Sequence, residues 1–79
     1  MAGNIGRRIY GNCNGYFGPD DYETKVIIDE TPTSICCKYV RKQLRDRYAV
    51  ADFENERIKS NLIDEWEREG EPVDEDEEY

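Results

Sequence analysis

Histidine is absent from the 79 residues of this sequence, and cysteine and proline occur only three times each. Without histidine, neither a serine–histidine nor a cysteine–histidine nucleophile can form, and the commonest metal ligand is missing. The spacing of Cys13, Cys36 and Cys37 does not match a zinc site, and no glycine-rich phosphate-binding motif occurs. We therefore expect a protein that is not an enzyme and that holds no metal and no cofactor.

Long apolar runs are missing too, because no stretch approaches the roughly 20 apolar residues that cross a membrane. Residues 1–10 contain Arg7 and Arg8 without an apolar run after them, so we expect no secretory signal. An odd number of cysteines, two of them adjacent, favours reduced thiols over disulfides. These features predict a soluble, cytoplasmic protein with a single small domain.

The net charge of −8 is distributed unevenly along the chain. From residue 64 onward ten acidic side chains accompany one arginine, so this segment carries −9 and the 63 residues before it carry +1. Residues 38–47 have the opposite bias, with five basic side chains and one acidic one. A basic segment followed by an acidic tail is the most informative pattern in the chain.

The first part of the chain predicts β-structure. Residues 7–10 can form a short strand, and residues 11–20 read as a long turn rich in glycine and asparagine. The β-branched run at 26–28 predicts a second strand over 22–29. The expectation is an antiparallel β-ribbon over residues 7–29.

Residues 33–48 have two interpretations. Thr31 suits a helix cap and Pro32 suits the first helical position, so we expect a helix over 33–48. The apolar side chains that would share one helical face are Cys36, Cys37, Val40, Leu44 and Tyr48. The alternative is a strand over 34–40 that forms a hairpin with 22–29.

A second helix is expected to begin after Asp52, its predicted N-cap, and to end at Gly70. Its apolar face would consist of Ile58, Leu62, Ile63 and Trp66. The predicted fold is therefore an α+β domain over residues 1–69, in which the β-ribbon (7–29) packs on a two-helix hairpin (33–69). Residues 70–79 are a like-charge run with little to bury, and we expect them to form a disordered acidic tail.

Residues 13–25 resemble a motif of short uncharacterised phage and bacterial proteins, with the approximate pattern C-N-G-[FY]-F-G-x-D-x-Y followed by a lysine. The matching positions are Cys13, Asn14, Gly15, Phe17, Gly18, Asp20, Tyr22 and Lys25. In that group a strand follows the motif, and a second strand tends to come after it. The resemblance implies a phage origin, and small acidic phage proteins are often inhibitors of host machinery.

The acidic segment is the first candidate binding site. Its carboxylates can imitate a phosphate backbone and attract a basic surface of a host protein that handles nucleic acid. The candidate residues are Asp64, Glu65, Glu67, Glu69, Asp74, Glu75, Asp76, Glu77 and Glu78. The leading hypothesis is thus a non-enzymatic regulator or inhibitor that acts as a partial DNA mimic, and the alternative for this segment is a solubilising extension.

The basic segment is the second candidate. In the expected helix its basic side chains share one face, which suits contact with phosphates. The candidate residues are Lys38, Arg41, Lys42 and Arg45. This alternative hypothesis is a small nucleic-acid-binding or transcription-regulating module, although the stripe could also be solvated surface or could bind the protein's own tail. Phe53 lies off the expected apolar face and leaves room for a homodimer.

Overall fold

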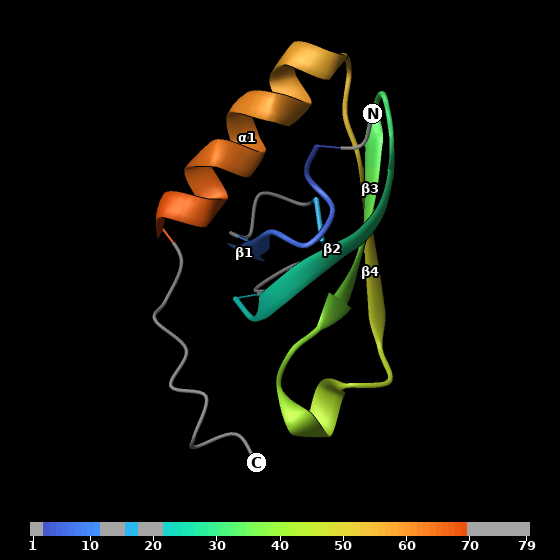
Figure 1. The fold of residues 1–79 in the computed structure, drawn as a ribbon, viewed down its shortest axis with the longest axis vertical. Helices are drawn as coiled ribbons and strands as arrows, with labels where there is room; N and C mark the ends of the chain where they lie inside the picture. Colours follow the sequence, from blue (N-terminus) through green and yellow to red (C-terminus); the bar gives the residue numbers. More distant parts are fainter. Residues whose placement is uncertain (1–2, 12–15, 18–21, 70–79) are drawn as a thin grey trace.

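The computed structural model describes residues 3–11, 16–17 and 22–69 (Figure 1). The elements are β1 (Arg8–Tyr10), β2 (Thr24–Thr31), β3 (Ser34–Tyr39), the 3-10 helix η1 (Lys42–Leu44), β4 (Tyr48–Asp52) and α1 (Glu56–Glu69). The four strands form one antiparallel sheet in the order β1-β2-β3-β4, and α1 lies across one of its faces (Figure 1). The predicted α+β class is confirmed, and the predicted tail lies outside the described residues.

The predicted two-helix hairpin is wrong, because residues 33–48 contain β3, η1 and the first residue of β4, joined by turns. The alternative hairpin is the one found, since β2 pairs with β3 on one side and β4 pairs with β3 on the other. The adjacent Cys36 and Cys37 share a face on a helical wheel, but they lie on opposite faces of the sheet because strand side chains alternate. Thr31 caps no helix, and its hydroxyl lies 2.7 Å from that of Ser34 across the hairpin turn.

The core lies between the sheet and α1. Its buried members are Ile9, Ile27, Ile35, Cys37, Ala51, Phe53, Ile63 and Trp66. The Trp66 side chain is fully buried, and the rings of Tyr16, Phe17 and Phe53 lie around it with centroids 5.0 to 6.0 Å away. Phe53 is therefore a core residue and not an apolar side chain left outside the core.

The helix α1 begins later than predicted. Asn55 accepts a hydrogen bond from the backbone N–H of Ile58 at 2.9 Å, which is the geometry of an N-cap. Asp52, the predicted cap, is instead the last residue of β4. The predicted apolar face is confirmed, because it packs against the core. Within the described residues, no helix is both long and apolar enough to cross a membrane.

A register shift in β2 changes which side chains face the helix. Ile27 pairs with Cys37 and Asp29 pairs with Cys36, so Ile28 has no partner on β3. Beyond this point the alternation is offset by one residue. Glu30 consequently lies on the same face as the core and meets α1.

Candidate binding surface

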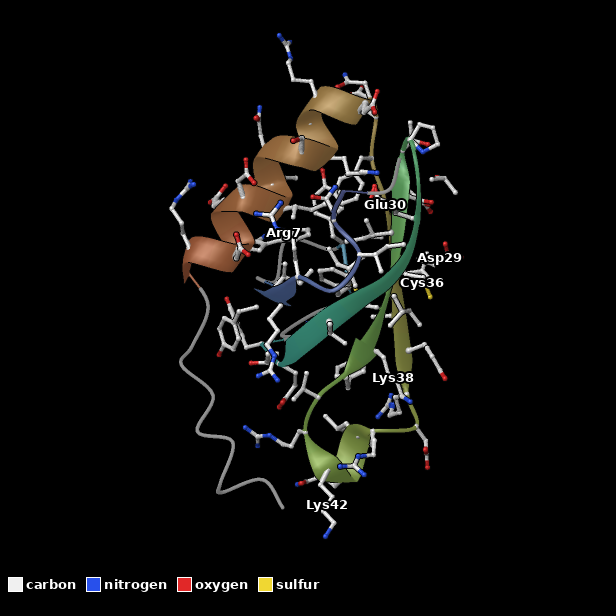
Figure 2. All side chains as sticks on the ribbon, viewed as in Figure 1. Arg7, Asp29, Glu30, Cys36, Lys38 and Lys42 are labelled. Carbon is white, nitrogen blue, oxygen red and sulfur yellow. The ribbon has the colours of Figure 1, made fainter. Side chains whose placement is uncertain are left out.

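The face of the sheet that α1 leaves uncovered, here called the open face, carries the other half of the strand side chains. Arg8, Val26, Lys38 and Tyr48 form one row across the four strands. Asp29, Cys36 and Val50 form the next row. Figure 2 shows Asp29 and Cys36 pointing away from the helix. Tyr48 and Val50 are 58% and 57% exposed, so two large side chains of this face are open to solvent.

A cluster of positive charge, here called the basic end, lies where β3 leaves the sheet and β4 enters it (Figure 2). It consists of Lys38, Arg41, Lys42, Arg45 and Arg47. Apart from half-buried Lys38, these side chains are exposed. The structure thus places three of the four predicted basic residues (Arg41, Lys42 and Arg45) in the connection between β3 and β4 and Lys38 near the end of β3, and not on one face of an α-helix.

Lys38 joins the basic end to the open face. Its Nζ lies 5.9 Å from the centroid of the Tyr48 ring, and this contact leaves most of the ring exposed. Arg41 forms an ion pair with Glu23 at 3.2 Å. The Arg41 side chain is still 56% exposed, so solvent screens this pair and the cation can meet another anion.

Sequence reasoning missed the contributions of Tyr48 and Arg47 to this surface. Tyr48 was assigned to the apolar face of a helix, whereas it lies on the open face. The signal that could have located it is the alternation of Tyr, Ala, Val, Ala and Asp over residues 48–52, in which small buried residues separate large exposed ones. Such an alternation is typical of a strand with one covered face.

Two of the predicted acidic residues are engaged within the fold. One nitrogen of Arg7, Nη2, lies 2.9 Å from Asp64 Oδ1 and 2.5 Å from Glu67 Oε1, and its Nε donates to Glu67 Oε2 at 3.2 Å. These hydrogen bonds hold the pKa of Glu67 below its ordinary value. Glu65 is exposed. The side chain of Glu69 and residues 74–78 lie outside the described part of the chain.

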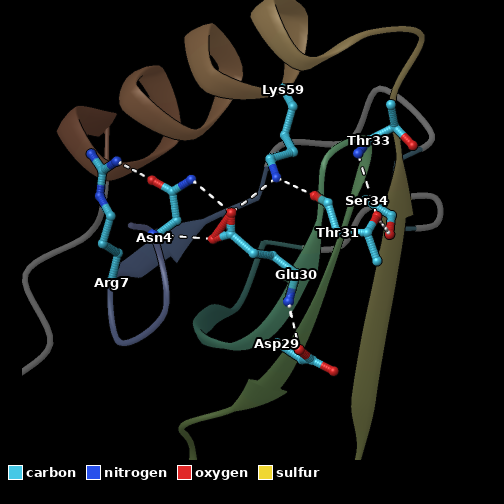
Figure 3. A network of polar contacts seen from close by, with 8 residues as sticks. All are labelled: Asn4, Arg7, Asp29, Glu30, Thr31, Thr33, Ser34 and Lys59. Carbon is cyan, nitrogen blue, oxygen red and sulfur yellow. Dashed lines mark hydrogen bonds and ion pairs between the residues drawn. The ribbon is translucent and has the colours of Figure 1, made fainter. Parts of the chain in front are cut away.

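Glu30 and Lys59 form a buried ion pair beneath the helix (Figure 3). Lys59 Nζ donates to Glu30 Oε2 at 3.0 Å and also to the carbonyl oxygen of Thr31. The backbone N–H of Asn4 donates to Glu30 Oε1 at 3.0 Å. Burial opposes ionisation of Glu30, but the hydrogen bonds from Lys59 and Asn4 outweigh it and hold its pKa below the ordinary value. This network fixes the segment before β1 to β2 and α1, and its charges are matched within the fold.

Two positions of the phage-like motif, Lys25 and Phe17, lie in or against the core. Lys25 is fully buried, its Nζ lies 4.5 Å from the centroid of the Phe17 ring, and it donates to the carbonyl oxygen of Glu23 at 2.7 Å. A Cβ on Gly11 would lie 2.4 Å from the Phe17 ring, so the side chain of any other residue at position 11 would displace this ring. These motif residues therefore have a clear structural use, while Cys13, Asn14, Gly15, Gly18 and Asp20 lie outside the described residues.

No metal site is evident in the described ranges, which contain no group of three or more histidine, cysteine, aspartate or glutamate side chains placed to hold an ion. The resemblance of residues 13–25 to phage proteins stays a prediction. Comparisons of the chain with protein-family models, with curated proteins and with solved structures find no match.

Proposed function

We propose that this protein is a cytoplasmic nucleic-acid-binding module that uses the basic end and the adjoining row of the open face. The observation that carries the proposal is the position of four exposed cations next to the exposed ring of Tyr48. Cationic side chains bind phosphates without regard to sequence, and aromatic rings stack on unpaired bases. The combination favours a single strand over a duplex.

Each part of the surface has a distinct task in this proposal. Lys42 and Arg47 project from the strand connection and contact phosphates, and Arg41 joins them by exchanging its exposed pair with Glu23 for a phosphate. Tyr48 stacks on a base, while Lys38, whose Nζ lies 5.9 Å from the centroid of that ring, contacts the phosphate of the same nucleotide. Val26 in the same row and Val50 in the next row supply apolar surface for neighbouring bases.

The experiment is fluorescence anisotropy of the full chain with a labelled single-stranded oligonucleotide at several salt concentrations. The double variant Lys42→Glu/Arg47→Glu should lose most of the affinity, and a parallel change of its salt dependence should correspond to about two lost phosphate contacts. The matched control is Arg57→Glu, which reverses one exposed charge on α1. The single variants Lys42→Glu and Arg47→Glu are compared with this control. The proposal would be contradicted if either one lost no more affinity than the control, or if the wild type did not bind at low salt.

A second candidate function is the binding of a basic host protein by the acidic C-terminal segment. It is supported by the charge of −9 from residue 64 onward and by the exposure of Glu65. It is weakened by Arg7, which already pairs with Asp64 and Glu67.

Deletion of residues 70–79 distinguishes the two functions. If the tail binds a partner protein, the shortened chain should capture less of it from a host lysate, and this difference should shrink in high salt. If the tail instead covers the basic end, the shortened chain should bind the oligonucleotide more tightly. Unchanged capture, with no dependence on salt, would eliminate the second candidate.

A further inference from the structure

The strand β4 forms one edge of the sheet, with β3 on its inner side. The N–H of Tyr39 donates to the carbonyl oxygen of Arg47 at 3.3 Å, and that of Phe53 donates to Thr33 at 2.7 Å. Along an antiparallel strand, the backbone N–H and C=O groups of one residue point toward the neighbouring strand, and those of the next residue point away from it. Ala49 and Ala51 therefore bond to β3, whereas the residues between them point their N–H and C=O groups outward.

The residues whose backbone N–H and C=O groups point away from β3 are Tyr48, Val50 and Asp52. Proteins usually protect such an edge with a lysine, a proline or a bulge, because an unpaired edge can accept another strand. The sequence of β4 has neither lysine nor proline, and its pairing with β3 runs without a register shift. The edge is thus a regular strand that has no lysine, proline or bulge within the described part of the chain.

We propose that the occupant of this edge is a second copy of the chain, with the two β4 strands antiparallel and related by a two-fold axis at Val50. Val50 of one copy exchanges both backbone hydrogen bonds with Val50 of the other. Tyr48 of each copy then lies opposite Asp52 of the other, so that the phenol can donate to the carboxylate. All of these side chains are on the open face, which continues from one copy into the next.

Charge explains why a second copy suits this edge better than an unrelated strand. The chain enters β4 with Arg45 and Arg47, with Asp46 between them, and leaves it with exposed Asp52, Glu54 and Glu56. Antiparallel pairing about Val50 brings residues 45–47 of each copy, with a net charge of +1, near residues 52–57 of the other, with a net charge of −2. This complementarity exists within one strand and its flanks, whereas a foreign strand would have to supply it separately.

Sedimentation velocity of the full chain, without nucleic acid, tests the proposal. The wild type should shift from monomer to dimer as its concentration rises, and added salt should weaken the dimer. Val50→Lys should be monomeric over the same range, because it places two like charges at the two-fold axis. The control Ile28→Lys adds the same charge to the open face but away from the edge, and it should dimerise as the wild type does.

A second measurement locates the contact. Amide hydrogen exchange of Val50 should slow at concentrations where the dimer forms and should be fast on dilution, because its N–H points away from β3. A wild type that stays monomeric at every concentration would overturn the proposal. So would loss of the dimer in Ile28→Lys but not in Val50→Lys, which would indicate packing of open faces against each other.

Discussion

Lys59 shows how a buried charge is accommodated by one carboxylate and one carbonyl. Its side chain is 3% exposed and that of Glu30 is 10% exposed, so water screens the pair poorly. Removing one member leaves the other charge buried without a counter-ion, and this costs more than losing the pair as a whole. The pair therefore fixes the position of α1 on β2 more than it adds net stability.

Lys59→Met should lower the free energy of unfolding by about 3–5 kcal/mol, because it leaves the Glu30 carboxylate unpaired. The double variant Glu30→Met/Lys59→Met should lose much less. Urea unfolding followed by the fluorescence of buried Trp66 measures both values. The control Arg57→Met changes an exposed cation on the same helix and should alter stability by less than about 0.5 kcal/mol. Equal losses in the single and double variants would contradict this account.

Two carboxylates make stability depend on pH. Glu30 and Glu67 both have a lowered pKa in the folded protein, so the unfolded chain binds more protons in the acidic range. Their contribution is fully present above the unfolded pKa of about 4.3 and is lost as pH falls through the lower folded values. Urea unfolding at a series of acidic pH values should show stability decreasing with pH. Arg7→Gln should remove the part that depends on Glu67 and make the decrease shallower.

The cap of α1 is an element-scale prediction. Asn55→Ala should destabilise the protein by about 1 kcal/mol, because the N–H of Ile58 loses its acceptor. Asp52→Ala, at the cap position that the sequence indicated, should change stability little when measured at low protein concentration. Thermal unfolding followed by circular dichroism compares the two variants. A larger loss for Asp52→Ala would place the start of the helix earlier.

The elements differ in how well the sequence predicts them. The helix α1 was predictable, because Ile58, Ile63 and Trp66 repeat with a helical period and no strand pattern competes with it. The strand β3 was not, because the residues from Cys36 to Tyr48 also fit a helical wheel. Pairing with a strand on each side decided between these patterns, and such distant partners are not visible in a short window of sequence.

The candidate site was likewise predictable only in part. The basic residues from Lys38 to Arg45 were identifiable from their charge alone. Their surroundings were not, because the position of Tyr48 beside Lys38 depends on the register between β3 and β4. The engagement of Asp64 by Arg7 depends on α1 crossing back to the start of β1, which is a property of the whole topology.

At the scale of the whole molecule, one face of the sheet builds the core and the other presents a flat surface with a cationic border. Tyr48→Ala should reduce affinity for a single-stranded oligonucleotide by about 1–3 kcal/mol, because a stacking partner is lost. Affinity for a duplex of equal length should change little, and Tyr48→Phe should bind a single strand as the wild type does. Anisotropy titrations compare the three proteins, and equal losses with both ligands would argue against stacking.

Side chains on a strand alternate between the two faces of the sheet, and the extra residue Ile28 shifts this alternation by one position within β2. Before it, odd-numbered residues such as Ile27 face the helix, and after it the even-numbered Glu30 does. If Ile28 were deleted, side chains would alternate regularly along the whole of β2, and both Ile27 and Glu30 would still face the helix. If a residue were deleted from β3, every side chain beyond the deletion would move to the opposite face of the sheet. The fold can therefore tolerate the deletion of Ile28 from β2, whereas it could not tolerate the deletion of a residue from β3.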